Sequence, residues 1–475
     1  MDSVPEIEFL SIHEAWQQMQ DGALSPQALT EACFRQIERL NPKLNAFITI
    51  CDEVIERAED PKQSPHQQEI DPPRKTRLAA TLNHIPFAIK DLFETKGIRT
   101  TAGSLFFKDY IPNEDAAVIQ KLKAAGAVIM GKTNTHEIAL GVTTNNPHFG
   151  ATRNPWDTKR IPGGSSGGSA VAVATGMSLA ALGTDTGGSI RIPASLCGVV
   201  GLKPTYGRVS LRGVFPLSWN LDHVGPITHT VMDAALVLQI LAGYDPQDPA
   251  SINMSVGDYL SHLKDEIKGK KFALAVGSYI EESDNEVIAA VNETTKVFAS
   301  FGAKVKKVEM DFLREAATAN SLITQADGAA YHRDRLAEHP DRFGADVRAR
   351  LESGRSSTST EYSLARRTQT EMSHRFAQFF EQYDFLLLPT TPIPAPLIES
   401  SDAVEQARRL TRFTAPFNLT GLPAISVPCG YSKEGLPIGL QIITKAWNEA
   451  GVLRSSHAYE HQTNWGMRSP LILQS

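Results

Sequence analysis

Two glycine-serine turns and one lysine at the end of a strand are the parts of this 475-residue sequence whose residue types suggest covalent chemistry. The turns, Gly163–Ser169 and Gly187–Ser189, flank a stretch of small residues. Glycines allow positive φ and a close approach of a ligand to backbone N–H groups. Clustered N–H donors can hold a developing oxyanion, and losing one donor costs about 3–4 kcal/mol of barrier. Ser189 directly follows two glycines, where its hydroxyl can attack a bound carbonyl carbon.

A serine hydroxyl needs a base at neutral pH, and none of the 13 histidines lies in these turns. Lys90 ends the short apolar run Phe87–Ile89. Burial there would disfavour its ammonium form and bring its pKa toward about 7–8, where a lysine can act as a base. Spacing alone does not place Lys90 beside Ser189. Taken singly, a glycine-serine turn is most often flexible and a lysine at a strand end is most often solvated.

Two other motifs suggest different chemistry. Gly126–Thr133 fits the phosphate-binding pattern GxxxxGK[ST]. Its variable positions, however, are typical of a strand and not of the exposed turn that phosphate binding requires. Gly163–Gly167 fits the GxSxG elbow of α/β-hydrolases, with Asp384 and His457 as possible partners. That alternative leaves the second glycine-serine turn unexplained, so it ranks second among hydrolase mechanisms.

Helix and strand patterns alternate around these residues. Strands are predicted at Ile85–Asp91 and Ala127–Gly131, with a helix over 116–126 between them. The same alternation predicts further strands at Lys271–Val276, Lys304–Val308, Phe385–Pro389 and Ala424–Pro428, and a helix at Asn285–Phe301. This order is typical of an α/β fold. We expect a large, mixed and mostly parallel central sheet covered by helices on both faces.

The chain shows no internal repeat and no clear linker, so the prediction is one domain over residues 1–475. Ser11 with Glu14 forms a capping-box pattern, and Ser25 precedes a proline that suits a first helical turn. The expected parts are a helical N-terminal segment at about 5–60, a polar loop at 60–77, a catalytic core at about 80–245, and the remainder of the α/β domain to 475.

Composition narrows the classes of protein that this chain can be. A net charge of −6 and a pI of about 6.1 offer no basic surface for nucleic acid or an anionic membrane. The four cysteines are scattered, which argues against a disulfide framework. The N-terminus has no apolar core of a signal peptide, and no apolar run is long enough for a membrane span. We expect a cytoplasmic enzyme that binds neither nucleic acid nor membrane.

The sequence resembles the amidase-signature family from about Ser11 to Trp465. The segments that carry the resemblance are IPFAIKDLFETKGIRTTAGS, GAVIMGKTNTHEIALG, the whole Gly163–Ser210 block, FLLLPTTP and GLPAISVPCG. The resemblance implies the amidase-signature fold, hydrolysis of C–N bonds through an acyl-enzyme, and no metal or cofactor.

The resemblance also implies a Ser–cis-Ser–Lys triad. The nucleophile falls on Ser189, and the bridging serine, next to a cis peptide bond, falls on Ser165. The base falls on Lys90, which would take the Ser189 proton through Ser165. The backbone N–H groups around Thr186, Gly187, Gly188 and Ser189 would form the oxyanion hole. Supporting roles fall on Ser166, Thr184, Asp185 and Arg191.

The sequence departs from the glutamine-hydrolysing A subunits of tRNA-dependent amidotransferases at two places. A YDGVRYG-like stretch is replaced by GAAYHRDRL over 328–336, and VFPLSWNLDHVGP stands where a more polar segment is expected. These changes remove polar partners for an amino acid and favour an apolar substrate pocket. The residues expected to line it are Phe215, Leu217, Trp219, Phe413 and Phe417.

The sequence therefore predicts a stand-alone amidase, aryl acylamidase or urethanase that acts on small apolar or aromatic amides and carbamates as a monomer or homodimer. Two alternatives stay open. One is a glutamine-hydrolysing A subunit of a tRNA-dependent amidotransferase complex. The other is a non-catalytic subunit of a complex, against which the presence of Lys90, Ser165 and Ser189 argues.

Overall fold

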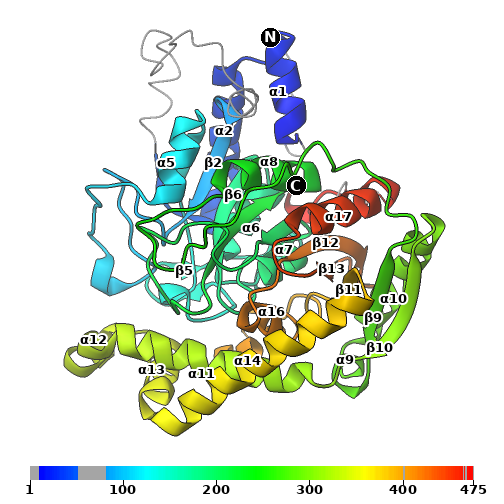
Figure 1. Cartoon of the computed structure of the whole chain (residues 1–475). Helices are drawn as coiled ribbons and strands as arrows, with labels where there is room; N and C mark the ends of the chain where they lie inside the picture. The colour runs from blue at the N-terminus through cyan, green and yellow to red at the C-terminus, as the bar shows by residue number, and fades with distance from the viewer. Residues whose placement is uncertain (1–9, 52–81, 400–401, 464, 466–467, 474–475) are drawn as a thin grey trace.

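The computed structural model describes residues 10–51, 82–399, 402–463, 465 and 468–473 (Figure 1). Its strands are β1 (Phe47–Ile50), β2 (Pro86–Lys90), β3 (Val128–Thr133), β4 (Asn145–Asn146), β5 (Gly150–Ala151), β6 (Ala180–Asp185), β7 (Val200–Lys203), β8 (His223–Thr228), β9 (Lys271–Val276), β10 (Lys304–Glu309), β11 (Phe385–Pro389), β12 (Ala424–Tyr431) and β13 (Pro437–Ile443). Its α-helices are α1 (Ile12–Gln20), α2 (Pro26–Leu44), α5 (Ala117–Ala124), α6 (Gly167–Ala174), α7 (Arg191–Cys197), α8 (Val231–Leu241), α9 (Ser278–Glu281), α10 (Asn285–Ser300), α11 (Leu313–Tyr331), α12 (Arg333–Glu338), α13 (Ala345–Ser356), α14 (Ser359–Gln382), α15 (Ala403–Leu410), α16 (Ala415–Leu419) and α17 (Glu449–Thr463).

The described strands build one 11-stranded mixed sheet in the order β1-β3-β2-β6-β8-β7-β12-β13-β11-β9-β10. The two remaining strands, β4 and β5, pair only with each other. The predicted α/β fold with a large mixed sheet is confirmed. The predicted strands all form, and the elements that begin at Ser11 and Ser25 are capped as the sequence indicated.

The expectation of a mostly parallel sheet is wrong for the middle of the sheet. Parallel pairs join β3, β2 and β6 on one side of the sheet, and β11, β9 and β10 on the other, while the edge strand β1 is antiparallel to β3. Between β6 and β11 every neighbouring pair is antiparallel. The reason is local for β12 and β13, since a tight turn in which Ser432 N–H donates to Leu436 O joins them. A parallel pair would need a crossover of a dozen or more residues.

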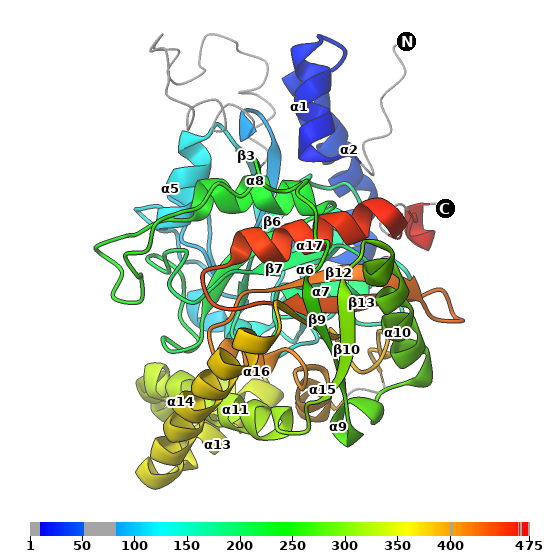
Figure 2. The ribbon, with the colours of Figure 1, turned by 45° about the vertical axis from the view of Figure 1, so that its right-hand side comes forward.

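Helices cover both faces of the sheet, as β9 demonstrates. Phe272 and Leu274 point into the main core, where the Phe272 ring stacks on Phe298 of α10 at 4.6 Å. Ala273 and Ala275 point to the opposite face, into a second cluster that includes Phe376 of α14. This period of two is the alternation expected of a strand with apolar residues on both sides. Figure 2 shows α8 and α17 side by side over the sheet, and these two helices are in contact.

The helices α11, α13 and α14 form a group along the bottom of the molecule as drawn in Figure 1. This group stands in the chain between β10 and β11. Its helix α11 also packs on α16, which follows α15 near the C-terminal strands. The group packs on the sheet through Phe376 of α14, and α11 is the helix that brings it next to the glycine-serine turns.

The predicted polar loop at 60–77 lies outside the described residues. Within the described ranges, none of the helices combines the length and the apolar character that crossing a membrane requires.

Phe376→Ala should lower the free energy of unfolding by about 3–5 kcal/mol, because the ring is fully buried in the second cluster and its loss leaves a cavity. Leu364→Ala on the same helix is the matched control, since this leucine is 57% exposed and should change stability little. Urea denaturation followed by circular dichroism measures both. Equal stabilities of the two variants would contradict the packing described for α14.

Candidate active site

Lys90 is the last residue of β2, and β2 runs parallel to β6 in the interior of the sheet. The amine is fully buried. Its Nζ donates to Ser165 Oγ at 2.6 Å and to Thr184 Oγ1 at 2.7 Å. Burial lowers the pKa of Lys90 to about 7, against the opposing effect of the Asp185 and Asp222 charges. An amine that is about half neutral near pH 7 and bonded to a serine hydroxyl can accept that serine's proton.

The turn that carries Ser165 is fixed from outside by threonines. The Gly164–Ser165 peptide bond is cis, next to the serine for which the family resemblance implied it. Thr135 Oγ1 donates to Ser165 O at 2.9 Å, and Thr144 Oγ1 donates to Gly163 O at 2.7 Å. The turn leads directly into α6, whose residues are all buried.

The small residues of α6 allow its close packing. A Cβ atom at Gly168 would collide with the backbone oxygens of Ala46 and Asn134. Glycine at this position therefore lets α6 lie against the neighbouring backbone, which fixes the direction in which the Ser165 turn enters the site.

The second turn brings Ser189 next to the first. Ser166 N–H donates to Ser189 O at 3.2 Å, so the two serine turns are joined through their backbones. Gly188 has a φ of 136°, and a Cβ there would collide with Thr414, so only glycine suits this position. Ser189 is 5% exposed, and the described residues supply no hydrogen bond to its hydroxyl. This hydroxyl remains available to a bound substrate.

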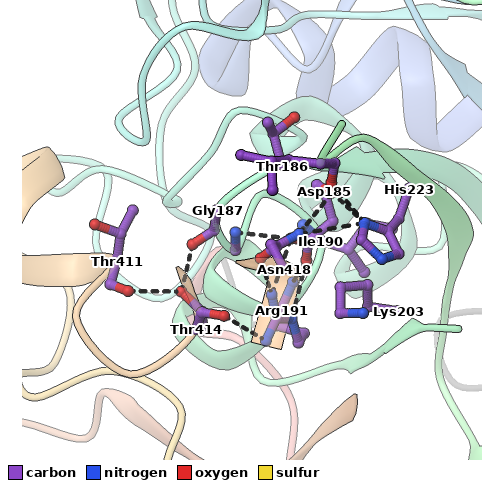
Figure 3. Close-up of polar contacts among 12 residues, drawn as sticks. Asp185, Thr186, Gly187, Ile190, Arg191, Lys203, His223, Thr411, Thr414 and Asn418 are labelled. Atoms are coloured by element: carbon purple, nitrogen blue, oxygen red, sulfur yellow. Dashed lines mark hydrogen bonds and ion pairs between the residues drawn. The ribbon is translucent and has the colours of Figure 1, made fainter. Parts of the chain in front are cut away.

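A buried ion pair holds the Ser189 turn (Figure 3). Arg191 Nη2 lies 2.9 Å from Asp185 Oδ1, and both side chains are fully buried. Asp185 also accepts hydrogen bonds from the N–H groups of Gly188 at 2.7 Å and Ile190 at 3.1 Å. Burial opposes ionisation of Asp185, but the charge and hydrogen bonds of Arg191 outweigh it and hold the pKa of that carboxyl well below its usual range.

Three of the four N–H groups expected around the oxyanion hole have no acceptor among the described residues: those of Thr186, Gly187 and Ser189. The prediction for Gly188 is corrected, because its N–H is already donated to Asp185. The other supporting residues lie next to the triad. Thr184 accepts from Lys90, and Ser166 Oγ donates to Thr184 O at 3.2 Å.

The predicted apolar pocket does not exist as one site. Phe413 and Phe417 are fully buried in the second cluster, where their rings pack on Tyr279 and Phe376. Leu217 is buried in a different cluster beside the half-buried Phe215, and Trp219 is 47% exposed. Phe413, Phe417 and Phe215 pack into or against separate cores because apolar packing, not proximity in sequence, decides where they point.

Polar residues that the sequence analysis did not identify surround the Ser189 turn. Asp222 accepts from Thr186 Oγ1 at 2.6 Å, and Asn320 Nδ2 donates to Thr186 O at 3.2 Å. Asn418 bonds both Asp185 and Arg191, and Thr414 Oγ1 donates to Gly187 O at 2.6 Å. They come from the residue before β8, from α11 and from the α15–α16 segment, and nothing in their spacing signals that these elements meet.

The structure gives no support to the two competing motifs. Lys132 of the GxxxxGK[ST] pattern lies in β3, fully buried, and donates to Phe93 O and Thr100 Oγ1 at 2.6 Å each. Of the possible partners for the GxSxG elbow, Asp384 accepts from Lys271 N–H and His457 lies 3.8 Å from Glu460. The described contacts join neither of them to the Ser165 turn.

The amidase family model matches residues 28–453. The A subunit of the glutamyl-tRNA(Gln) amidotransferase of Geotalea daltonii is 40% identical over 97% of this chain and 98% of its own length. The crystal structure of the corresponding A subunit from Thermotoga maritima matches with a TM-score of 0.81 and 36% identity, covering 96% of this chain and 95% of that one. A chain from a protein complex described as revealing the origins of an s-triazine catabolic enzyme matches with a TM-score of 0.87 and 33% identity, over 96% and 98%.

These similarities overturn the substrate and partner predictions. Relatives at this identity over nearly the whole chain are named as a subunit of an amidotransferase, not as stand-alone enzymes for apolar amides or carbamates. The prediction of a monomer or homodimer with no nucleic acid is wrong on the same ground. The net charge of one chain does not exclude such partners, because it says little about what a complex containing that chain would bind.

Arg191→Lys should destabilise the fold by about 3 kcal/mol and strongly reduce reactivity at Ser189. Lysine keeps the charge but lacks the planar set of donors that bonds Asp185, Thr414, Asn418 and Gln441, so buried acceptors stay unpaired. Arg367→Lys, at a 75% exposed arginine paired with Glu371, is the control and should match the wild type. Thermal unfolding and labelling by a fluorophosphonate measure the two effects. A fully stable and reactive Arg191→Lys protein would contradict the role of the ion pair.

Proposed function

Because the chain belongs to the amidase-signature family, whose members act on amides, we propose that it is the glutamine-hydrolysing A subunit of a tRNA-dependent amidotransferase complex. The observation that carries this proposal is the 40% identity with such an A subunit over 97% of this chain and 98% of the relative. Similarity that extends over both chains from end to end covers the elements around the catalytic turns as well as the turns themselves.

The geometry supports a mechanism in which the carboxamide carbon is attacked by Ser189 Oγ. Neutral Lys90 takes the Ser189 proton through Ser165, to which its amine is bonded at 2.6 Å. The N–H groups of Thr186, Gly187 and Ser189 stabilise the oxyanion of the tetrahedral intermediate. The proton then returns through Ser165 to the leaving nitrogen, which departs as ammonia. Water hydrolyses the acyl-enzyme to release glutamate and restore Ser189.

The opening of the site is polar, which favours a substrate such as glutamine over an apolar amide. Gly187 is the half-buried residue of the catalytic turn. The side chains nearest to it are those of Asn320, which turns its amide oxygen toward Gly187, and Thr411, which presents its methyl group while its hydroxyl donates to Ala407 O. The Asn320 amide can bond a polar substrate, whereas Phe413 and Phe417 lie in the second cluster.

The proposal includes protein partners and a tRNA-bound acceptor for the released ammonia, as the name of the relatives indicates. It also includes a cytoplasmic location. None of the four cysteines forms a disulfide within the described part of the chain, which is in keeping with a reducing compartment.

The purified protein, by itself or with its co-expressed partners, should release ammonia and glutamate from glutamine. Ser189→Ala should lower the rate of this hydrolysis on the order of a thousandfold or more. Ser195→Ala is the matched control. This serine is also buried and lies close in sequence, but its hydroxyl has no hydrogen-bond partner, so activity should persist. Ammonia and glutamate assays measure the rates. Efficient hydrolysis of an anilide with no turnover of glutamine, with or without the partners, would reject the proposal.

Lys90→Met should reduce acylation of Ser189 by orders of magnitude while the fold persists, because the side chain keeps its volume but loses the base. In the wild-type protein the acylation rate should rise with pH through about 7 and then level off, since burial lowers the pKa of Lys90 to about 7 and only the neutral amine accepts a proton. Fluorophosphonate labelling across pH measures both. A pH-independent rate would refute the assignment of Lys90 as base.

A further inference from the structure

Asp222 occupies a position at the active site that no catalytic assignment covers. In the antiparallel pair of β6 and β8, Asp185 stands opposite His223. Asp222 precedes His223 and Thr186 follows Asp185, so the two lie next to each other just beyond the paired strands. Asp222 is only 7% exposed. A carboxyl group is thus held in the interior at the end of the strand that carries the catalytic turn.

Every polar contact of this carboxylate fixes the turn or the segment beside it. Oδ1 accepts from Thr186 Oγ1 at 2.6 Å. Oδ2 accepts from the N–H groups of Leu217 at 2.9 Å and Ser218 at 3.1 Å. Asp222 therefore joins segment 217–222 to Thr186, whose own N–H is one of the proposed oxyanion donors. Motion of Thr186 would have to break the shortest of these bonds.

Asp222 also differs from Asp185 in its charge environment. Asp185 forms a buried ion pair with Arg191, which compensates its charge. None of the ion pairs in the described ranges includes Asp222. Its negative charge still acts on Lys90, which reaches Thr184 two residues before Thr186. The uncompensated carboxylate near the catalytic amine is consequently that of Asp222.

We infer that Asp222 is a positioning residue with two roles: it holds Thr186 in the oxyanion turn, and it supplies the negative charge that keeps Lys90 basic enough to take the Ser189 proton. This inference rests on the proposed function of Lys90 and Ser189. The other titratable or charged groups around the pair are Asp185 of β6, Arg191 of α7, Lys203 of β7, Tyr206, His223 of β8 and Asp327 of α11.

The pKa values of Lys90 and Asp222 set the direction in which loss of the Asp222 charge shifts the pH dependence of acylation. Burial lowers the pKa of Lys90 to about 7, while the Asp185 and Asp222 charges raise it. Burial raises the pKa of Asp222 to about 6, so this carboxyl is ionised in the range where Lys90 loses its proton. Removing the Asp222 charge makes Lys90 give up its proton more easily. The acidic limb of the acylation rate must then move to lower pH.

The decisive variant is Asp222→Asn, in which the amide carbonyl can accept from segment 217–222 and the amide N–H can donate to Thr186 Oγ1. The second-order rate of Ser189 labelling by a fluorophosphonate is measured against pH, without any need for the natural substrate. We expect the midpoint of the acidic limb to fall by about one pH unit. An unmoved midpoint in a folded Asp222→Asn protein would overturn the inference.

Asp327→Asn is the matched control, because Asp327 is buried on the same side and accepts from Ser218 Oγ at 2.6 Å but does not bond Thr186. It should leave the midpoint in place. If both variants shifted it equally, the effect would not be specific to the Asp222 carboxylate, and the inference would fail.

Thr186→Val tests the first role separately, since it removes the bond to Asp222 and keeps a carboxyl nearby. It should lower the alkaline plateau of the labelling rate about tenfold, and an unchanged plateau would remove that role. Thr186→Val still tests the contact between Asp222 and Thr186 if the Asp222→Asn protein does not fold. A wild-type protein that the probe does not label would instead reject the proposed function of Ser189, which keeps the two failures distinct.

Discussion

The buried ion pair between Asp185 and Arg191 is the interaction on which the rest of the site depends. Asp185 ends β6 and Arg191 begins α7, so the pair spans the Ser189 turn from one side to the other. Arg191 also donates to Gln441 of β13 at 2.6 Å and to Asn418 of α16 at 2.6 Å. One guanidinium therefore connects the catalytic turn to the C-terminal part of the sheet. Burying two charges is costly, and only this number of hydrogen bonds offsets it.

This neutralisation permits the unusual state of the lysines nearby. Burial lowers the pKa of Lys90 to about 7, and it lowers that of Lys203 well below its ordinary value, to which the neighbouring Arg191 contributes. Lys203 donates to two backbone oxygens, those of Pro204 and Leu422. Lys90 donates instead to two hydroxyls, of Ser165 and Thr184. A carbonyl cannot relay a proton and a hydroxyl can, so of these two lysines Lys90 is the one placed to exchange a proton with its partners.

Sequence patterns predicted the parts of the fold that are locally encoded. The strands at β2, β9 and β11 have continuous apolar runs, and the capping residues Ser11 and Ser25 mark their helices. Patterns do not encode which strands become neighbours, so the antiparallel middle of the sheet was missed. In the site, the triad positions came from the resemblance. Asp222 and Asn320 have no local signature, because their roles arise only when β8 and α11 meet the turn.

The failed pocket prediction has a physical cause that also explains the polar opening. Large apolar side chains such as Phe413 and Phe417 stabilise the protein most when they are fully buried, and the core behind α16 offers that burial. The backbone of the Ser189 turn instead stays partly accessible at Gly187, where the Asn320 amide oxygen and the Thr411 methyl group are the nearest side-chain atoms. Since the turn carries N–H donors that a substrate carbonyl must reach, apolar packing over it would block the reaction. Phe413 and Phe417 therefore support the turn from the core, on either side in sequence of Thr414, which donates to Gly187 O, and leave the opening free.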